Sequence, residues 1–417
     1  MKQLNVDNPG LSGIIRPGDQ VLWGEGPGEP VSLVNALSTQ LDRLEAVRFF
    51  VGFGSTLPRE ASAFGAKRVT SYGAIGTTRR LAAAGGLDIV PCHIGLLPHY
   101  IADGTIPCDV ALVHVSAPGP DGRFSLGASV MHMEAAIGRA RVVVAEVNEL
   151  MPWTYGGQGL TCDQIDFYVE TSTALPEHPP STLSPADIAI ARNAATYVGD
   201  GATLQIGIGA VPDALLQLLG DRRDLGIHSG MISDRVGDLI RSGVVTNSRK
   251  PIDTGTSVAG ILVGTSRLYE LARENVCLQV RPSSYTHSPA TLAQIPGFVS
   301  INSALEVDLT GQVNAEAIEG RFIGATGGQA EFLRAAHRSP GGRAIVALPA
   351  TSGGRSRIVA RLSGPVSTPR SDIDVVVTEF GVAELRGRSL AERRRALIAI
   401  ADPIHRDALE ECTGDPE

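Results

Sequence analysis

Short apolar runs rich in β-branched residues alternate with helical patterns along the chain, and this alternation constrains the fold most. The predicted strands are mostly four to six residues long and cover 110–115, 142–147, 261–264, 344–348 and 374–377. The predicted helices cover 32–44, 186–198, 212–219 and 389–401. Continuous apolar strands between helices indicate mostly parallel sheets covered on both faces. The predicted fold class is therefore α/β.

A proline-rich segment near the middle of the chain predicts a domain boundary. The chain has 417 residues, more than one hydrophobic core usually organises, so we expect two domains. The prolines of Glu177–Pro185 end any preceding helix, and Ser184 followed by Pro185 is typical of a helix start. The predicted domains are residues 1–184 and 185–417.

Two matching segments indicate that the domains are similarly built. Val21–Pro30 and Leu204–Pro212 both read as a strand, a glycine loop and a proline leading into a helix. Their prolines lie 182 residues apart, on either side of the predicted boundary. We therefore expect two α/β domains of similar construction, although such turns are common in α/β proteins and one pair can arise by chance.

Charge and composition exclude several classes of partner. The net charge is −8 and no long basic run occurs, so neither nucleic acid nor an anionic membrane surface is an expected partner. No signal-peptide core or apolar run of about 18 residues is present, which favours a cytoplasmic protein without a membrane span. The cysteines are odd in number and lack C-x-x-C spacing, which favours reduced thiols and predicts no metal site: Cys92, Cys108, Cys162, Cys277 and Cys412.

The first candidate binding element is the loop of Gly207, Gly209 and Ala210. Glycine lets the backbone approach a ligand closely, and the following helix presents unpaired N–H groups at its start. Such a loop can hold a phosphate, a carboxylate or a developing thioester oxyanion. The pattern lacks the third glycine of a dinucleotide motif and any G-K-[S/T]. A tight connection without a ligand is the alternative.

Two further glycine clusters are candidates for ligand contacts. The first contains Gly324, Gly327, Gly328 and Gln329, and its alternative interpretation is an Ω-like surface loop. The second, Thr351–Arg357, combines glycines with two arginines and suits a phosphate-bearing ligand, or else is a mobile solvated loop.

Two ionisable residues have both a site interpretation and a structural one. His228 follows a predicted strand beside the first glycine loop, which favours a site role, whereas a lone histidine in an α/β protein is more often structural. Glu146, at a strand end, fits a site acid and a hydrogen-bonded structural carboxylate equally well.

Several separated segments together resemble the acetyl-CoA hydrolase/transferase family, which includes the 4-hydroxybutyrate CoA-transferases. The resemblance runs from about Gly18 to Leu409. It rests on the active-site segment 204–216 with 226–231, and on these shorter matches: 109–116, 122–127, 145–152, 244–247, 301–303, 313–316, 327–329, 356–359 and 378–387.

This resemblance implies a fold, a co-substrate and a set of binding residues. The implied fold has two CoA-transferase-like domains, and the implied assembly is a homodimer. Coenzyme A or acyl-CoA is implied as a substrate, with no permanently bound cofactor. The residues implied to bind the acyl group or CoA are Gly207, Gly209, Ala210, Asn247, Asn314, Gly324, Gly327, Gly328, Gln329 and Ser356.

The chain departs from the family at its catalytic position. In the family a glutamate follows the His-Ser/Thr pair, attacks acyl-CoA and carries CoA as a glutamyl thioester. Here His228 and Ser229 are followed by Gly230, which has no side chain to attack with. The usual glutamyl-CoA intermediate is therefore not expected at this position.

Three hypotheses accommodate Gly230. In the first, the acyl group passes from CoA directly to a small acceptor (carboxylate, water, amine or alcohol), with His228 as general base. In the second, Glu25 in the matching loop of the first half replaces the missing nucleophile, although a solvent-facing loop glutamate is favoured somewhat over that role. In the third, the protein is a non-catalytic acyl-CoA or CoA-binding protein or an inactive subunit of a CoA-transferase.

Overall fold

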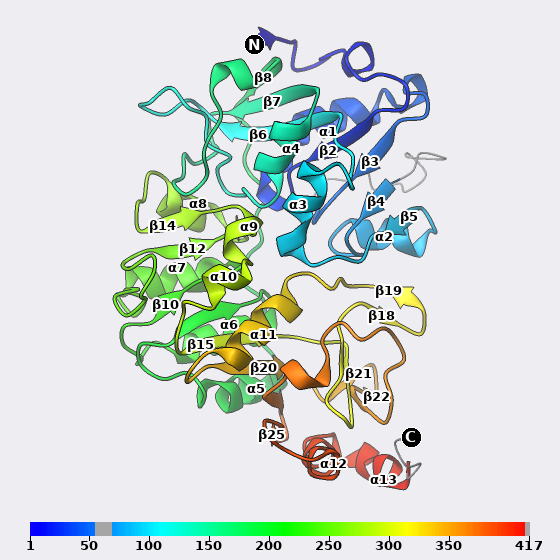
Figure 1. Ribbon diagram of the computed structural model, residues 1–417, viewed down its shortest axis with the longest axis vertical. Helices are drawn as coiled ribbons and strands as arrows, with labels where there is room; N and C mark the ends of the chain where they lie inside the picture. Colours follow the sequence, from blue (N-terminus) through cyan, green and yellow to red (C-terminus); the bar gives the residue numbers. More distant parts are fainter. Residues whose placement is uncertain (55–68, 413–417) are drawn as a thin grey trace. The chain divides into compact units, whose positions relative to one another are not determined.

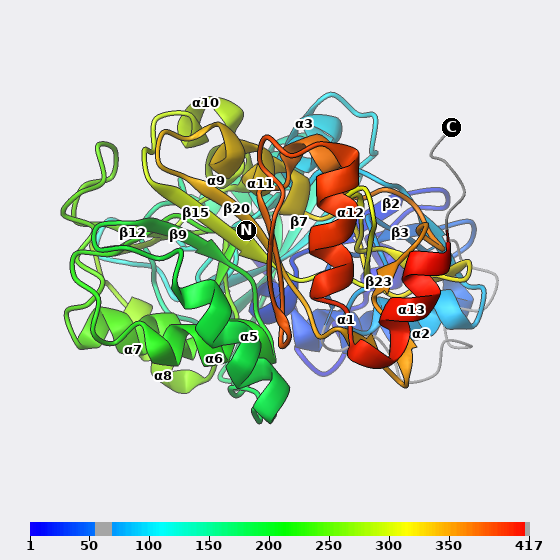
Figure 2. The ribbon, with the colours of Figure 1, turned by 90° about the horizontal axis from the view of Figure 1, so that it is seen from below.

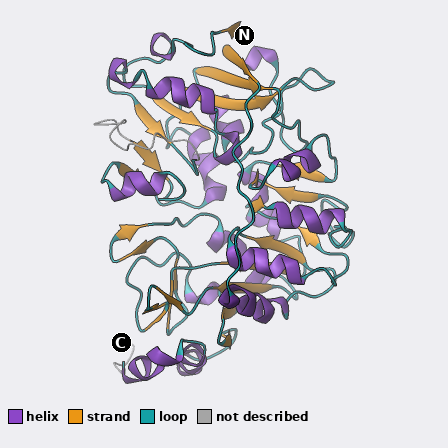
Figure 3. Ribbon diagram, turned by 180° about the vertical axis from the view of Figure 1, so that it is seen from behind, coloured by secondary structure: helices purple, strands orange, loops and turns teal. Residues whose placement is uncertain are grey.

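The chain forms two compact α/β units in the computed structural model, which describes residues 1–54 and 69–412 (Figure 1). The first unit comprises Met1–Pro179, Thr256–Ser288 and Arg321–Gly327. The second comprises Pro180–Gly255, Pro289–Gly320 and Gly328–Glu417. Within each unit, helices alternate with strands, as the colouring in Figure 3 shows.

This division differs from the predicted continuous domains 1–184 and 185–417. Two segments from the predicted second domain belong to the first unit because their backbones pair with it. Ser129 bridges Ile261, and the Ala74 N–H donates to the Gly324 carbonyl at 2.8 Å. The sequence could not predict this exchange, since it depends on pairing between residues far apart in the chain.

The first unit is built on an eight-stranded sheet in which every neighbouring pair is parallel. Two neighbouring strands, Val110–Ser116 and Val142–Asn148, each have seven consecutive buried residues, which explains their mostly apolar sequences. The spatial order is β1 (Lys2–Gln3), β8 (Phe167–Thr171), β7 (Val142–Asn148), β6 (Val110–Ser116), β2 (Gln20–Trp23), β3 (Arg48–Phe50), β4 (Val69–Ser71), β5 (Leu87–Ile89).

The other elements of the first unit are short helices and strands. The helices are α1 (Val31–Ser38), α2 (Thr78–Ala83), α3 (Leu97–Ala102), α4 (Met133–Arg139), α8 (Ser266–Ala272) and α9 (Ser283–Thr286). The remaining strands are β12 (Ser257–Ala259), β13 (Ile261–Leu262), β14 (Leu278–Val280) and β19 (Arg321–Phe322). Trp23, Phe49 and Leu112 are among the buried side chains of its core.

The second unit is built on a six-stranded sheet, parallel except for its last pair. Figure 2 shows α11 on one side of this sheet, and α5 and α6 on the other. The spatial order is β10 (Gly226–Ile227), β9 (Thr203–Ile206), β15 (Phe298–Asn302), β20 (Arg343–Ala347), β24 (Val375–Thr378), β25 (Gly381–Glu384). Two mostly parallel sheets confirm the predicted α/β class.

The helices and smaller strands of the second unit complete its layers. The helices are α5 (Pro185–Ala195), α6 (Ala210–Leu218), α7 (Asp234–Arg241), α10 (Pro289–Leu292), α11 (Gln329–Arg338), α12 (Leu390–Ala399) and α13 (Pro403–Glu411). The smaller strands are β11 (Met231–Ile232), β16 (Glu306–Asp308), β17 (Val313–Asn314), β18 (Ala317–Ile318), β21 (Thr351–Ser352), β22 (Arg355–Ser356) and β23 (Ile358–Val359).

The predicted start of α5 is confirmed in atomic detail. The Ser184 side chain accepts a hydrogen bond from the Asp187 N–H, and the Asp187 carboxylate accepts one from the Ser184 N–H. Pro185 occupies the first helical position, where its missing N–H costs nothing. This reciprocal capping satisfies two backbone donors that would otherwise be unpaired.

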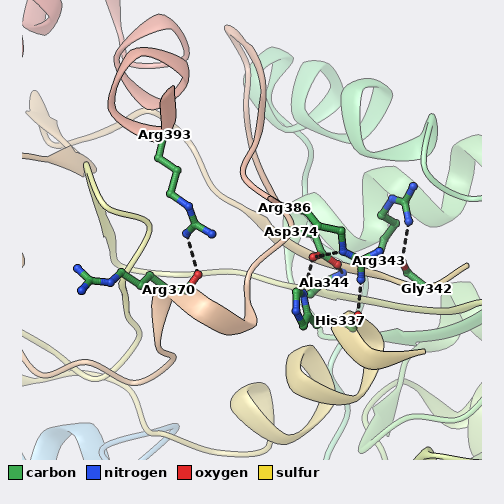
Figure 4. A network of polar contacts seen from close by, with 8 residues as sticks. All are labelled: His337, Gly342, Arg343, Ala344, Arg370, Asp374, Arg386 and Arg393. Carbon is green, nitrogen blue, oxygen red and sulfur yellow. Dashed lines mark hydrogen bonds and ion pairs between the residues drawn. The ribbon is translucent and has the colours of Figure 1, made fainter. Parts of the chain in front are cut away.

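Asp374, a fully buried residue directly before β24, connects several elements of the second unit (Figure 4). Its Oδ1 accepts hydrogen bonds from His337 Nδ1 at 2.6 Å and from Arg386 Nε at 2.8 Å. Its Oδ2 accepts one from the Ala344 N–H at 2.9 Å, and Arg386 also donates to the His337 carbonyl. One carboxylate thereby connects α11, β20, β24 and the chain after β25.

Candidate active site

The glycine loop of the second unit follows the carboxyl end of β9, where ligands of parallel sheets commonly bind. Gly209 has φ +118°, a conformation that favours glycine, and it precedes the first residue of α6, Ala210. A Cβ atom at Gly207 or Gly209 would meet no atom of residues 1–54 and 69–412 within 4 Å, so the loop borders open space. No side chain caps α6, which leaves its first N–H groups available to an anion.

His228, Ser229 and Gly230 directly follow the neighbouring strand β10 and are buried. The Ser229 hydroxyl donates to the Ile206 carbonyl at 3.2 Å, which places it against the last residue of β9. The His228 N–H donates to the Leu204 carbonyl at 3.0 Å. The structure therefore brings the His-Ser-Gly segment and the glycine loop together at one end of the sheet, as the sequence predicts.

Asn247 contributes to this region by holding β10 in place. It has φ +55°, and its Oδ1 accepts a hydrogen bond from the Ile227 N–H at 2.8 Å. Lys250 donates from Nζ to the Ile227 carbonyl at 3.0 Å. These two side chains fix the residue that precedes His228.

A polar group on β15 borders the same end of the sheet. Ser300 and Asn302 both donate to Gln205 Oε1, at 2.6 and 2.8 Å. Gln329, the first residue of α11, donates from Nε2 to the Ser303 carbonyl at 3.2 Å. The predicted ligand residue Gln329 thus lies beside the end of β15, next to β9 in the sheet.

The remaining predicted ligand residues of the second unit have mainly local contacts. Asn314, fully buried, donates from Nδ2 to Glu306, while its Oδ1 accepts from the N–H groups of Glu316 and Ala317. Ser356 donates to the Ile358 carbonyl at 2.6 Å. Gly328 directly precedes α11. These contacts explain the local structure. A ligand role for Asn314, Ser356 and Gly328 stays a prediction.

Gly324 and Gly327 belong to the first unit, apart from Gly328 and Gln329. Their carbonyls accept hydrogen bonds from the Ala74 and Ile94 N–H groups, at 2.8 and 3.2 Å. Gly327 has φ +57° and a Cβ there would meet nothing within 4 Å. The second glycine cluster therefore spans the division between the units.

Glu25 lies in the first unit and is 2 % exposed, which contradicts the interpretation as a solvent-facing loop residue. Its Oε2 accepts hydrogen bonds from the Tyr72 hydroxyl at 2.6 Å and from the Phe53 N–H at 2.9 Å. His132 Nδ1 lies 3.7 Å from Glu25 Oε1. Tyr72 and His132 are also buried. Neither Tyr72 nor His132 can be predicted from local sequence patterns, because both meet Glu25 only through the fold.

The pKa values of this cluster follow from burial. Burial raises the pKa of Tyr72 well above its usual range, and the Glu25 charge raises it further. Burial lowers the pKa of His132, an effect that the Glu25 charge opposes. At neutral pH the cluster therefore holds a protonated phenol and an uncharged imidazole.

Phe53 connects Glu25 to a cavity of about 420 Å³ in the first unit. Thr77, Arg80 and His178 also line the cavity, and the Phe53 ring lies 5.7 Å from the His178 ring. This volume is within the range of small-molecule pockets.

Of the two interpretations of Glu146, a site acid or a structural carboxylate, its contacts support the structural one. Its carboxylate is fully buried and accepts hydrogen bonds from the Ser32 N–H at 2.8 Å and the Leu33 N–H at 3.3 Å. These donors lie in the first turn of α1, whose start favours a negative charge. Glu146 therefore caps a helix.

Comparison with known proteins decides the family. The family model of the acetyl-CoA hydrolase/transferase N-terminal domain matches residues 7–173, and that of the C-terminal domain matches residues 264–413. The chain belongs to the acetyl-CoA hydrolase/transferase family. The family includes CoA-transferase enzymes, and acyl-CoA substrates are implied by membership.

Individual relatives cover nearly the whole chain. It is 40 % identical to the 4-hydroxybutyrate coenzyme A transferase of Clostridium kluyveri, over 94 % of this chain and 92 % of that protein. It is 35 % identical to the succinyl-CoA:cyclohexane-1-carboxylate CoA transferase of Geobacter metallireducens, over 96 % and 92 %. The RipA structure from Yersinia pestis has a TM-score of 0.90 and 34 % identity, with 98 % and 96 % of the chains covered.

Proposed function

We propose that this member of the acetyl-CoA hydrolase/transferase family uses an acyl-CoA and transfers its acyl group or its CoA to a small acceptor. We further propose that no glutamyl thioester forms at position 230. Carboxylates are the acceptors best supported, because the names of its relatives describe transfer of CoA to carboxylic acids. Water, amines and alcohols are the other acceptors to test.

The observation that carries this proposal is the open glycine loop beside the buried His228–Ser229–Gly230 segment. Gly207 and Gly209 border open space, and the uncapped start of α6 supplies N–H donors where a thioester oxygen can gain negative charge. The adjacent position 230 has no side chain. The loop therefore suits thioester binding, while the covalent step of the family has no nucleophile at that residue.

A panel of acyl-CoAs tests this proposal. We expect release of CoA thiol, or exchange of CoA into an added carboxylate such as acetate, for at least one member of the panel. Tight binding of acyl-CoAs with no consumption, with or without the added acceptors, would instead support a CoA-binding protein or an inactive subunit.

A further inference from the structure

The cluster of Glu25, Tyr72 and His132 is a second chemically equipped position in the chain. Glu25 follows β2, Tyr72 follows β4, and His132 directly precedes α4. The exposed fractions of the three residues are 2 %, 3 % and 1 %. Burial of ionisable groups is costly unless they are paired, so such a cluster needs a structural or functional reason.

The two oxygens of the Glu25 carboxylate have different surroundings. Oε2 accepts hydrogen bonds from Tyr72 and the Phe53 N–H, whereas Oε1 accepts none from the residues that the structure describes and is 3.7 Å from His132 Nδ1. A Cβ atom at Gly52 would lie only 2.3 Å from Oε2. The glycine at position 52 therefore leaves the room that the carboxylate occupies.

The polar atoms of His132 are poorly satisfied by their surroundings. Among the described residues, neither of its ring nitrogens makes a hydrogen bond of ordinary geometry, although the ring is almost fully buried against Phe50; its polar neighbours are the Trp23 backbone and Glu25. Leaving a buried polar group unsatisfied costs about 1–3 kcal/mol. Such a cost is typical of a site where function, and not stability, determines the residues.

We propose that Glu25 is the nucleophile of the transfer reaction, with the Tyr72 hydroxyl and the Phe53 N–H as its oxyanion hole. This inference rests on the proposed function and adds the residue that replaces the missing glutamate. Phe53, whose N–H donates to the carboxylate, also lines the cavity, which has space for a small acyl group.

The reaction balances without any proton transfer. Oε1 of Glu25 attacks the thioester carbonyl carbon, the C–S bond breaks, and CoA leaves as a thiolate, which gives an acyl-glutamyl anhydride. The thiolate then attacks the Glu25 Cδ atom, the Cδ–Oε1 bond breaks, and the donor acid leaves as a carboxylate carrying Oε1. An acceptor carboxylate reverses these steps and becomes the new acyl-CoA.

The two hydrogen bonds to Oε2 are placed for the second step. When the thiolate attacks Cδ, negative charge develops on Oε2, which already receives donors at 2.6 and 2.9 Å. The raised pKa of Tyr72 keeps its hydroxyl protonated as a donor. Every leaving group in these reaction steps departs as an anion, so none of the steps requires a proton donor. An uncharged His132 is compatible with such a reaction.

The test combines turnover with mapping of the covalent adduct in the full chain. The protein is incubated with acetyl-, butyryl- or succinyl-CoA, treated with borohydride to reduce any glutamyl thioester, and analysed by peptide mass spectrometry. We expect the reduced residue at Glu25. Turnover without an adduct, or an adduct at another residue, would overturn this inference and leave the proposed function standing. If neither turnover nor an adduct is observed, both this inference and the proposed function are overturned.

Three variants sharpen the test. Glu25→Gln is expected to lose CoA exchange by about 10⁴-fold or more, together with the adduct. Tyr72→Phe retains the nucleophile and loses one oxyanion donor, so kcat should fall by about 10²–10³-fold while the adduct still maps to Glu25. Glu45→Gln, at an exposed position of the same unit, is the matched control and should leave the rate unchanged. Unchanged exchange in folded Glu25→Gln would contradict the assignment.

Discussion

At the scale of single residues, His114 shows how hydrogen bonds fix a protonation state. Asn148 Oδ1 accepts from the N–H groups of Leu150 and Thr173, so its Nδ2 faces His114 Nε2, at 3.0 Å. Nε2 is therefore an acceptor, and Nδ1 donates to the Pro27 carbonyl at 3.1 Å. The fold thus holds His114 uncharged, and burial lowers its pKa.

The lowered pKa predicts loss of stability in mild acid. Between the folded-state pKa of His114 and its unfolded value of about 6.5, the unfolded chain binds more protons than the folded one. The free energy of unfolding should therefore fall as pH falls below about 6.5. Above that pH, His114 should contribute no pH dependence. Urea unfolding at several pH values measures this dependence. The His114→Asn variant should be less stable at neutral pH, and its free energy of unfolding should decline less steeply as pH falls. A decline as steep as that of the unaltered protein would contradict the assignment of this pH dependence to His114.

The cysteines predict a pattern of thiol reactivity. Cys162, Cys277 and Cys412 are exposed, whereas Cys92 and Cys108 are buried, and no disulfide joins any of them in the described part of the chain. Burial, with a contribution from the Asp109 charge, raises the pKa of Cys108 to about 12, which suppresses its reactive thiolate. A thiol reagent should therefore modify three cysteines in the native protein and five in urea. Rapid native modification of Cys108, located by peptide mapping, would contradict the structure.

Single residues were also where prediction from sequence was least complete. The glycine loop and the His228–Ser229–Gly230 segment could be predicted together, because both follow strands that are close in the chain. Glu25 could be singled out from its matching loop, but its burial depends on Tyr72, 47 residues away, and on the Phe53 backbone. No local pattern encodes such contacts, so Tyr72 and His132 went unpredicted.

At the scale of elements, the Asp374 network predicts a large effect of one substitution. Asp374→Ala removes the acceptor shared by His337, Arg386 and the Ala344 N–H, and leaves these donors without their partner. Removing one partner of a buried charged network costs about 3–5 kcal/mol of unfolding free energy. Urea denaturation measures the loss. Asp407→Ala, at an exposed position of α13, is the control and should change stability by no more than about 0.5 kcal/mol. Equal effects of the two substitutions would refute the role of the network.

Most elements followed from apolar patterning and capping residues. The predicted strand 142–147 is β7 (Val142–Asn148), and the predicted helix 186–198 is α5 (Pro185–Ala195). The predicted helix 32–44 is shorter, because α1 ends at Ser38 and a separate 3-10 turn covers Leu41–Arg43. The predicted strand 261–264 is reduced to β13 (Ile261–Leu262). Periodicity located these elements but left their ends to tertiary contacts.

At the scale of the whole molecule, the candidate site residues are divided between the two units. The second unit has the open glycine loop and the segment ending at Gly230, and the first has the Glu25 cluster. Predicted boundaries at 184/185 missed the two later segments of the first unit because chain order does not report which strands pair. Within residues 1–54 and 69–412, no helix is long and apolar enough to cross a membrane.

We propose that this chain transfers CoA or acyl groups although position 230 is glycine. The most direct measurement follows CoA exchange by mass spectrometry, with the unaltered full chain, an acyl-CoA panel and an added carboxylate such as acetate. We expect a new acyl-CoA to form from the added carboxylate at a rate proportional to the protein concentration. Saturable binding of the same acyl-CoAs, with no new thioester and no released CoA thiol for any acceptor, would contradict it.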